Sequence, residues 1–212
     1  SAGTDFTGSL LLGHQTTGSL DAATYNTGVG LTALDALTTG DQNTAVGYAA
    51  LTSNTTGTRN TAYGYDALYT NGAGAANVGI GFQSLRSNTN GGSNIAIGFA
   101  SFYSNTTSYY NTAIGASSLQ DANRTADSDG YNTALGSFSG NTGTNDITTG
   151  NKNTLLGANT AASAAAGTNQ SVIGYGASSQ ADNSVTLGNA DVTTVYMSQD
   201  AGATIHAAGV TS

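Results

Sequence analysis

The sequence of 212 residues contains no cysteine, no proline and no tryptophan, and only 8% of its residues are charged. The lack of cysteine excludes disulfides, thiolate nucleophiles and zinc–thiolate sites. The lack of proline excludes a collagen triple helix. No apolar run reaches the roughly 18 residues of a membrane helix, and no amino-terminal signal peptide is visible. These absences leave a non-collagenous chain for which we expect no membrane insertion.

Basic residues are also scarce, with four Lys and Arg against twelve Asp and Glu and a formal net charge of -8. Nucleic-acid binding needs a cationic surface, so we expect no nucleic-acid partner. The abundance of Gly, Ala, Ser, Thr and Asn would suit a disordered chain. The order of these residues indicates something else.

A short motif recurs along most of the chain. Asn43-Thr-Ala-Val-Gly47 returns as Asn60-Thr-Ala-Tyr-Gly64 and again at 77–81, 94–98 and 111–115. The motif defines columns of equivalent residues, above all Gly47, Gly64, Gly81, Gly98 and Gly115 and the column of Asn43, Asn60, Asn77, Asn94 and Asn111. The residue numbers in each column rise by a constant 17, and such a constant step indicates a repeat architecture.

The unit favours strand over helix, because glycine in every repeat costs a helix about 1 kcal/mol. Residues 44–51 alternate with a period of two, and the Asn- and Gly-rich stretch that follows supplies turns. The sequence therefore predicts an all-β fold, a β-solenoid of 17-residue coils with two short strands and two turns each. At about 4.8 Å per coil, the shaft would be roughly 50 Å long.

The step changes towards the carboxyl end, where the glycine column continues from Gly115 to Gly136 and Gly157 with a step of 21. We expect the extra residues to form loops on one side of the solenoid. The predicted organisation is a shaft over 1–188 and a carboxyl-terminal β segment over 189–212. Within the shaft, 17-residue coils extend to about 130 and 21-residue coils to 157, and the coils shorten over 158–188.

A coil this short encloses little volume, and its inner wall is predicted to be Ala and Gly. One such chain buries too little apolar area to offset the entropy of ordering its backbone. A Val/Ile/Leu column, with Val46, Ile80 and Ile114 among its members, offers a second apolar face. We expect it to pack against sister chains, although the sequence leaves open which column faces the axis.

The stretch 170–188, with Ser171-Val-Ile-Gly174 and Ser184-Val-Thr-Leu-Gly188, resembles the 14-residue repeat of trimeric autotransporter adhesin heads. This resemblance covers about twenty residues. It implies a parallel β-roll and a homotrimeric fibre. The 17-residue units are similar to arrays in bacteriophage tail fibres and some bacterial surface proteins. The stalk and membrane anchor of the adhesins have no counterpart here, which weakens the resemblance to a cell-anchored protein.

The carboxyl end is similar to the segment that precedes the endosialidase-type intramolecular chaperone of phage tail fibres and tailspikes. It carries Val192-Thr-Thr-Val-Tyr-Met197, a turn at 199–202 and Ala203-Thr-Ile-His-Ala207. In that family the chaperone cuts itself off after trimer formation. The resemblance implies that a chain ending at Ser212 is the trimmed product, and an engineered boundary would give the same sequence.

No constellation of titratable residues predicts catalysis, and we expect no catalytic residue and no cofactor. Asp35, Asp66, Asp121 and Asp146 occupy different columns, so no pair stands out for glycoside hydrolysis. Weak metal candidates are Asp127 and Asp129, at the start of an incomplete calcium-type loop, and His206 near a three-fold axis. A plain surface turn is the favoured interpretation of Asp127 and Asp129, and ordinary packing is that of His206.

Two columns of variable residues indicate solvent-facing loops. One is the position before each Asn of the Asn43 column, and the other is the position after a Leu that recurs with the same step, such as Leu51 and Leu68. The candidates for receptor contact in these loops are Tyr69, Arg86, Tyr103, Tyr109, Tyr110 and Tyr131. Exposed tyrosines suit glycan stacking or protein contact. The same rings could instead cover the apolar edges of their own loops.

The expectation is a structural and adhesive fibre, a homotrimeric segment of a bacteriophage tail fibre or tailspike on the virion tail. Its partners would be a glycan or protein of the host cell surface and the neighbouring fibre proteins. The alternative is a trimeric adhesin or extracellular fibre on a bacterial cell surface. A glycan-cleaving tailspike ranks below both. An ice-binding solenoid ranks low, because Val78 and Ile95 interrupt the Thr column.

Overall fold

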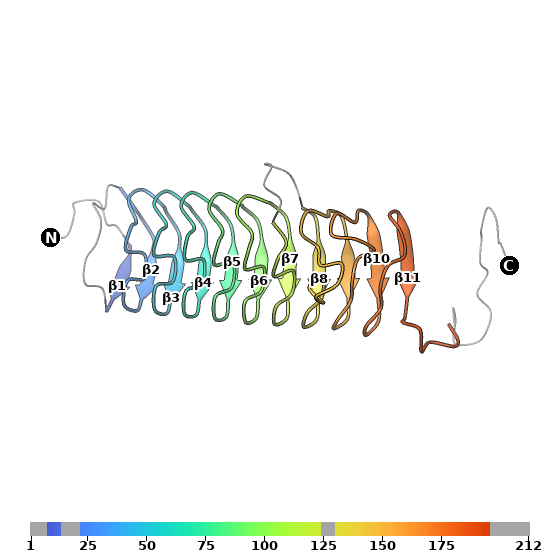
Figure 1. Cartoon of the computed structure of the whole chain (residues 1–212). Helices are drawn as coiled ribbons and strands as arrows, with labels where there is room; N and C mark the ends of the chain where they lie inside the picture. The colour runs from blue at the N-terminus through green and yellow to red at the C-terminus, as the bar shows by residue number, and fades with distance from the viewer. Residues whose placement is uncertain (1–7, 14–21, 124–129, 196–212) are drawn as a thin grey trace, which may run out of the picture.

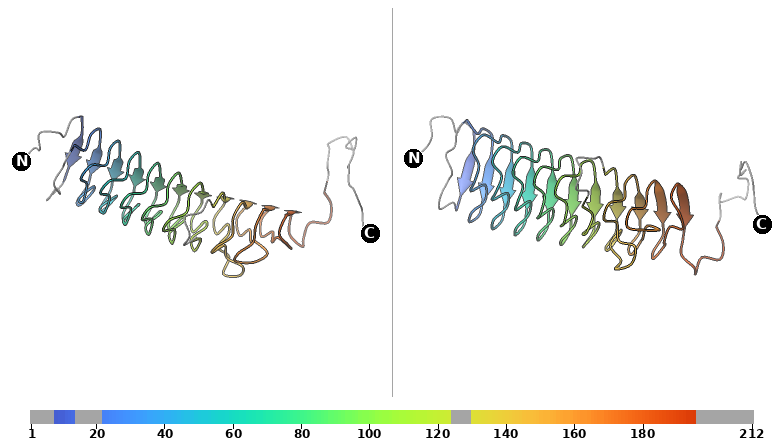
Figure 2. Two further views of the ribbon diagram at one scale, coloured as in Figure 1. Left: turned by 90° about the horizontal axis from the view of Figure 1, so that it is seen from above. Right: turned by 45° about the horizontal axis from the view of Figure 1, so that its top comes forward.

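The described part of the computed structural model, residues 8–13, 22–123 and 130–195, is an elongated β-solenoid. Eleven strands form one parallel sheet in which each strand pairs with its neighbours in chain order (Figure 1). The strands are β1 (Leu10–Leu12), β2 (Thr27–Val29), β3 (Thr44–Val46), β4 (Thr61–Tyr63), β5 (Val78–Ile80), β6 (Ile95–Ile97), β7 (Thr112–Ile114), β8 (Thr133–Leu135), β9 (Thr154–Leu156), β10 (Gln170–Ile173) and β11 (Ser184–Leu187). The views in Figure 2 show the strands along one side and the connecting arcs along the others.

The strand register reproduces the sequence period. Thr44 pairs with Thr61, and Ala45 with Ala62, so the register advances by 17 from one coil to the next. The step becomes 21 between Thr112 and Thr133, and 14 between Gln170 and Ser184. A parallel β-solenoid of 17-residue turns is therefore the fold, as the repeat predicted.

One strand per coil is found among the described residues, where the sequence analysis expected two. Strand β3 ends at Val46, and Gly47, Ala49 and Leu51 then adopt positive φ values of 135°, 53° and 52°. Alternate left-handed residues bend the chain into an arc while preserving a period of two, which the sequence pattern cannot distinguish from a strand. The arc still bonds to the next coil, since the Leu51 amide donates to the Ala67 carbonyl at 3.0 Å.

The interior holds two columns rather than the Ala and Gly wall alone. Ala45, Ala62 and Ala96 on the strands are completely buried. The recurrent Leu column lies opposite, with Leu34, Leu51, Leu68, Leu85, Phe102 and Leu119 all 0–1% exposed. Because Ala points inward, its neighbours on each strand point outward, and this places the Val/Ile/Leu column on the outer surface.

The glycine at the end of each strand is required by close stacking. Gly64 has a φ of 137°, and a Cβ added there would lie 2.5 Å from the Gly81 carbonyl oxygen. The same relation joins Gly81 to Gly98. Glycine is the residue that tolerates both the positive φ and the close approach of the next coil.

A ladder of buried asparagines runs through the shaft and is called the first Asn ladder. It comprises Asn26, Asn43, Asn60, Asn77, Asn94, Asn111, Asn132 and Asn153, each at most 3% exposed. Within it, Asn77 Nδ2 donates to Asn60 Oδ1 at 3.2 Å and to the Gly91 carbonyl at 2.8 Å. The Asn77 main-chain amide also donates to Asn60 Oδ1, at 3.0 Å.

A second Asn ladder was not anticipated, although its 17-residue step is visible in the sequence. It comprises Asn54, Asn71, Asn88 and Asn105, all 0% exposed. Asn71 Nδ2 donates to Asn54 Oδ1 at 2.8 Å and to the Gly74 carbonyl at 2.9 Å. Asn60 of the first ladder donates to the same carbonyl at 2.8 Å. The two ladders therefore fix one turn carbonyl from both sides, which satisfies a backbone group that stacking buries.

Two predicted features fall partly outside the described residues. Of the expected carboxyl-terminal β segment, the structure describes 189–195, and that stretch contains no strand. Of the two expected loop insertions, the second is described and forms a loop over Asn141–Asp146, whereas 124–129 in the first lie outside the described residues.

Candidate functional site

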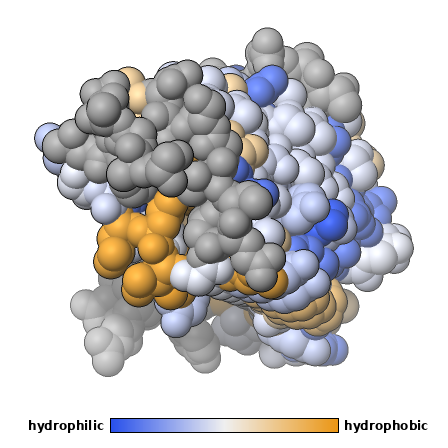
Figure 3. Space-filling view, turned by 90° about the vertical axis from the view of Figure 1, so that its left-hand side faces the viewer, coloured by the Kyte–Doolittle hydropathy of each residue, from blue (hydrophilic) through white to orange (hydrophobic). Residues whose placement is uncertain are grey.

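The outer face of the sheet carries a continuous row of apolar side chains, which we call the apolar stripe. It combines two columns. One is the outward-facing Val/Ile/Leu column of the strands, and the other is the residue that follows the glycine at the end of each strand. Its most exposed members are Leu12, Leu31, Tyr48, Tyr63, Tyr65, Phe82, Phe99, Leu135, Leu156, Ile173, Tyr175 and Leu187, each at least 40% exposed. Viewed from the amino-terminal end, the strongly apolar atoms gather low on the molecule rather than evenly around it (Figure 3). Extended exposed apolar surface of this kind marks an interaction site.

Aromatic rings stack along part of the apolar stripe. Tyr48, Tyr65, Phe82 and Phe99 follow one another with ring centroids 5.0, 5.2 and 5.3 Å apart. The planes differ by 15° or less, so each ring lies on the next coil's ring. The sequence shows this aromatic column, but its stacking depends on the coil spacing. The stack gives the stripe a stiff, regular surface.

The structure places three of the receptor-contact candidates in one cluster. The Arg86 guanidinium carbon lies 4.9 Å from the Tyr69 ring centroid and 5.8 Å from that of Tyr103. Arg86 Nε also lies 3.3 Å from Asp66 Oδ2. Burial alone would lower the pKa of Arg86, but the hydrogen bond to Asp66 leads the effects that raise it instead. All four side chains thus already make contacts within the chain.

The other three candidates form a second cluster, in which Tyr110 and Tyr131 directly precede an Asn of the first ladder and Tyr109 precedes Tyr110. Tyr110 and Tyr131 stack with centroids 5.2 Å apart, and Tyr109 lies tilted beside Tyr110 at 6.1 Å. The Tyr109 hydroxyl donates to the Asn90 carbonyl at 3.0 Å. Tyr110 and Tyr131 are 49% and 48% exposed. They are the most accessible of the six candidates.

The acidic candidates have different surroundings. Asp66 pairs with Arg86, whereas Asp121 and Asp146 both line one groove, a proximity that the sequence did not reveal. Asp127, Asp129 and His206 lie outside the described residues. Across the ranges that the structure describes, no group of three His, Asp or Glu residues is arranged to hold a metal ion. Those ranges also contain no helix with the length and apolar character to cross a membrane.

No protein-family model matches the chain, and neither the curated proteins nor the solved structures gave a match. The function must therefore be argued from the shaft and its surfaces.

Proposed function

We propose that the chain is a segment of a homotrimeric structural and adhesive fibre of the bacteriophage tail fibre or tailspike type. The observation that carries this proposal is the apolar stripe, which follows the sheet from β1 to β11. Three shafts placed side by side would cover three stripes along their whole length. The alternative assignment is a trimeric adhesin or extracellular fibre on a bacterial surface.

The interior of the coil supports an assembly rather than an isolated shaft. Its strand column is Ala or Gly in most coils, and its turns are held by buried Asn amides. Amide ladders satisfy polar groups but contribute modestly to net stability, about 1 kcal/mol per hydrogen bond. Burying Val, Ile, Leu and aromatic side chains of the stripe would add apolar area, at roughly 25 cal/mol per Å². The stripe is thus the largest apolar surface that an isolated chain leaves exposed, and burying it would add the most to stability.

Stiffness and repetition support the adhesive part of the proposal. Coils bond to one another along their strands, their arcs and the first Asn ladder, and four of them also through the second Asn ladder, so the shaft resists bending. Three chains would present each loop three times, and linked weak contacts strengthen one another through effective concentration. Tyr110 and Tyr131 are the side chains that we assign to contact with the host surface. In this account the fibre acts outside the cell, on the virion tail, with neighbouring fibre proteins at its ends.

The native mass tests the proposal. Light scattering of the intact chain should give three times 20.9 kDa, and the assembly should resist detergent without heating. Replacing two exposed stripe residues, Tyr63→Asp with Leu135→Asp, should lower the mass to that of one chain. Tyr25→Asp is the matched control, because Tyr25 is 62% exposed and lies off the stripe. A monomeric wild-type chain would contradict the trimer.

A binding assay tests the adhesive role. Fluorescently labelled protein should adhere to particular strains in a panel of bacteria. Tyr110→Ala combined with Tyr131→Ala should weaken adhesion by about tenfold or more, while the Tyr25→Ala protein adheres like the wild type. Equal adhesion of the double variant would remove these two rings from the contact surface.

A further inference from the structure

The loop Asn141–Asp146 leaves the shaft and returns to it at one point. Gly140 takes the place of the recurrent Leu, and a Cβ there would lie 2.8 Å from Leu119 Cδ2. The Ile147 amide donates to the Gly140 carbonyl at 2.9 Å, and the Ile147 side chain is fully buried. The loop is braced by the Gly143 amide, which donates to Asp146 Oδ1 at 2.7 Å. Gly140 and Ile147 therefore complete the core at the base of the loop, and the loop itself lies on the surface.

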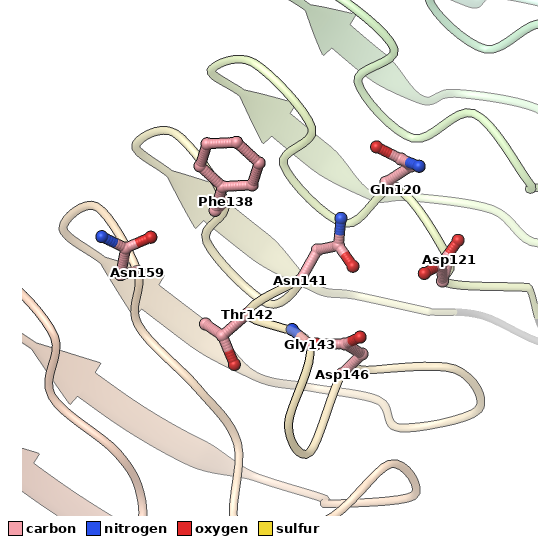
Figure 4. A pocket seen from close by; sticks show the side chains of 8 residues that line it. All are labelled: Gln120, Asp121, Phe138, Asn141, Thr142, Gly143, Asp146 and Asn159. Carbon is pink, nitrogen blue, oxygen red and sulfur yellow. The ribbon is translucent and has the colours of Figure 1, made fainter.

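A groove of about 580 Å³ lies between this loop and the neighbouring coils. Gln120 and Asp121 come from the preceding coil, Phe138, Asn141 and Asp146 from the loop's own coil, and Asn159 from the following one. Figure 4 shows Asn141 between the Phe138 ring on one side and the two carboxylates on the other. A volume of this size falls within the range of small-ligand sites, about 300–1,000 Å³.

Phe138 is the unusual residue of its column. The equivalent positions hold small or polar residues, and Ala49, Asp66, Ala100 and Ser117 among them are at most 6% exposed. Phe138 is 48% exposed and has a φ of 57°. A bulky side chain in this backbone region, exposed rather than packed, points to a role outside the core.

The opposite wall carries two carboxylates joined through one amide. With the Asn141 amide turned to donate, its nitrogen lies 3.2 Å from Asp121 Oδ2 and 3.3 Å from Asp146 Oδ2. This bridge fixes both acids at the edge of the groove. Planar carboxylate and amide groups beside an exposed aromatic ring provide acceptors, donors and one apolar face.

That combination matches the chemistry of a sugar ring. A pyranose has an apolar C–H face that can stack on Phe138, and hydroxyl groups that can donate to Asp121 and Asp146. The amides of Gln120 and Asn159 can both donate and accept. Among the residues that the structure describes, the groove lining contains no Lys or Arg, and the chain carries a net charge of -8, which disfavours anionic sugars.

We propose that this groove is a binding subsite for a neutral sugar ring of a surface polysaccharide. The proposal deepens the adhesive role proposed above and rests on it. It assigns stacking to Phe138, hydroxyl binding to Asp121 and Asp146, and positioning of both carboxylates to Asn141.

The test uses the full chain on an array of neutral and acidic glycans, followed by calorimetry with the neutral glycans that bind. Phe138→Ala should weaken binding tenfold or more, and Asp121→Asn should weaken it severalfold. Tyr25→Ala should bind as the wild type does, because Tyr25 is an exposed ring far along the shaft from the groove. Thermal unfolding must show that the Phe138→Ala and Asp121→Asn proteins remain folded.

Several outcomes would overturn the subsite. The protein could bind acidic glycans alone, prefer a Lys-rich peptide, or lose its binding when EDTA is added. It could also release reducing ends from the bound glycan, or the Phe138→Ala protein could bind with wild-type affinity. Absence of binding by any neutral glycan would do the same. A trimer that binds no glycan would refute the subsite and leave the fibre intact. A monomer that binds neutral glycans through Phe138 would refute the trimer and leave the subsite.

Discussion

Two regions of the shaft have the same strands but differ on the side of the coil opposite the sheet. In the 17-residue coils over 22–123, the recurrent Leu fills the core and the second Asn ladder holds the turn. In the 21-residue coil that follows, Gly140 replaces the Leu, and Ile147 and Leu155 fill the space. The first Asn ladder continues through both regions, since Asn153 still donates to Asn132 at 3.1 Å.

The difference separates what the fold requires from what it tolerates. The strand register and the glycine that ends each strand persist wherever coils stack, and the first Asn ladder persists through both of these regions. The corner opposite the sheet changes its residues and accepts a loop, and that loop forms the groove with Phe138. We therefore expect function on the side opposite the sheet, where the loop lies, and along the apolar stripe. The residues that persist from coil to coil are already engaged in stacking.

The largest effect is expected at the ladder glycine, in both regions alike. Gly64→Ala and Gly136→Ala would each place a Cβ against the next coil, 2.5 Å from the Gly81 carbonyl oxygen and 2.6 Å from the Ala158 amide nitrogen. Each should lower the free energy of unfolding by about 4 kcal/mol or more, measured by denaturant unfolding. Gly72→Ala is the control, because its nearest neighbour is 3.8 Å away. A tolerated Gly136→Ala would show that the two regions do not share this constraint.

A smaller loss is expected in the first Asn ladder. Asn77→Ala removes the acceptor of the buried Asn94 amide, which lies 3.1 Å away. The variant should lose about 3 kcal/mol of unfolding free energy, because a buried donor left unpaired bears its desolvation cost. Asn90 is exposed, so Asn90→Ala should change stability by less than about 0.5 kcal/mol. Equal losses in the two variants would remove the ladder from the account.

The replacement of Leu by Ile147 can be tested in the same way. Ile147→Ala in the second region and Leu68→Ala in the first should each cost about 2–5 kcal/mol, because both side chains are fully buried. A negligible loss for Ile147→Ala alone would mean that the loop's coil is held by something other than its core.

A modest effect is expected where Arg86 lies between Tyr69 and Tyr103. Arg86→Ala should destabilise by about 1 kcal/mol, since cation–π contacts and partly exposed ion pairs are each worth about that or less. Arg86→Lys should recover part of the loss, and Arg59→Ala should have no measurable effect. If Arg86→Ala left thermal stability unchanged but weakened adhesion, the cluster would belong to the contact surface.

The smallest effect concerns the last coils. A hydrogen bond from the Thr168 amide at 2.8 Å, followed by one from Gln170 at 2.7 Å, lowers the pKa of Asp182. These bonds favour the charged carboxylate, so their contribution is complete above the ordinary Asp pKa. It is lost as the pH falls through the lowered value. The Thr168 amide proton shift should titrate with a midpoint below the ordinary Asp pKa, and Asp182→Asn should abolish the titration.

The features that recur in every stacked coil could be predicted from the sequence. Because equivalent residues of successive coils touch, the Gly64 and Asn77 columns had to keep one residue type, and a step of 17 made them visible. The same step also carries the second Asn ladder at Asn54 and Asn71, so the sequence contained the signal for it. The single strand per coil could not be read, because left-handed residues such as Leu51 preserve the alternation of a strand.

The groove depended on information that the repeat does not contain. Asp146 lies in an inserted loop and belongs to no column, so its approach to Asp121 follows from the path of that loop. One signal was present, since Phe138 is the only bulky residue in a column of small and polar ones. The two tyrosine clusters were predicted as individual residues, whereas their stacking with Arg86 and with one another required the spacing between coils.

A crystal structure of the intact chain would test the central claim most directly. The account predicts three shafts around a common axis, with the apolar stripe buried between them and Tyr110 and Tyr131 facing outward. A lone shaft with Tyr63, Ile80 and Leu135 in contact with solvent would contradict it.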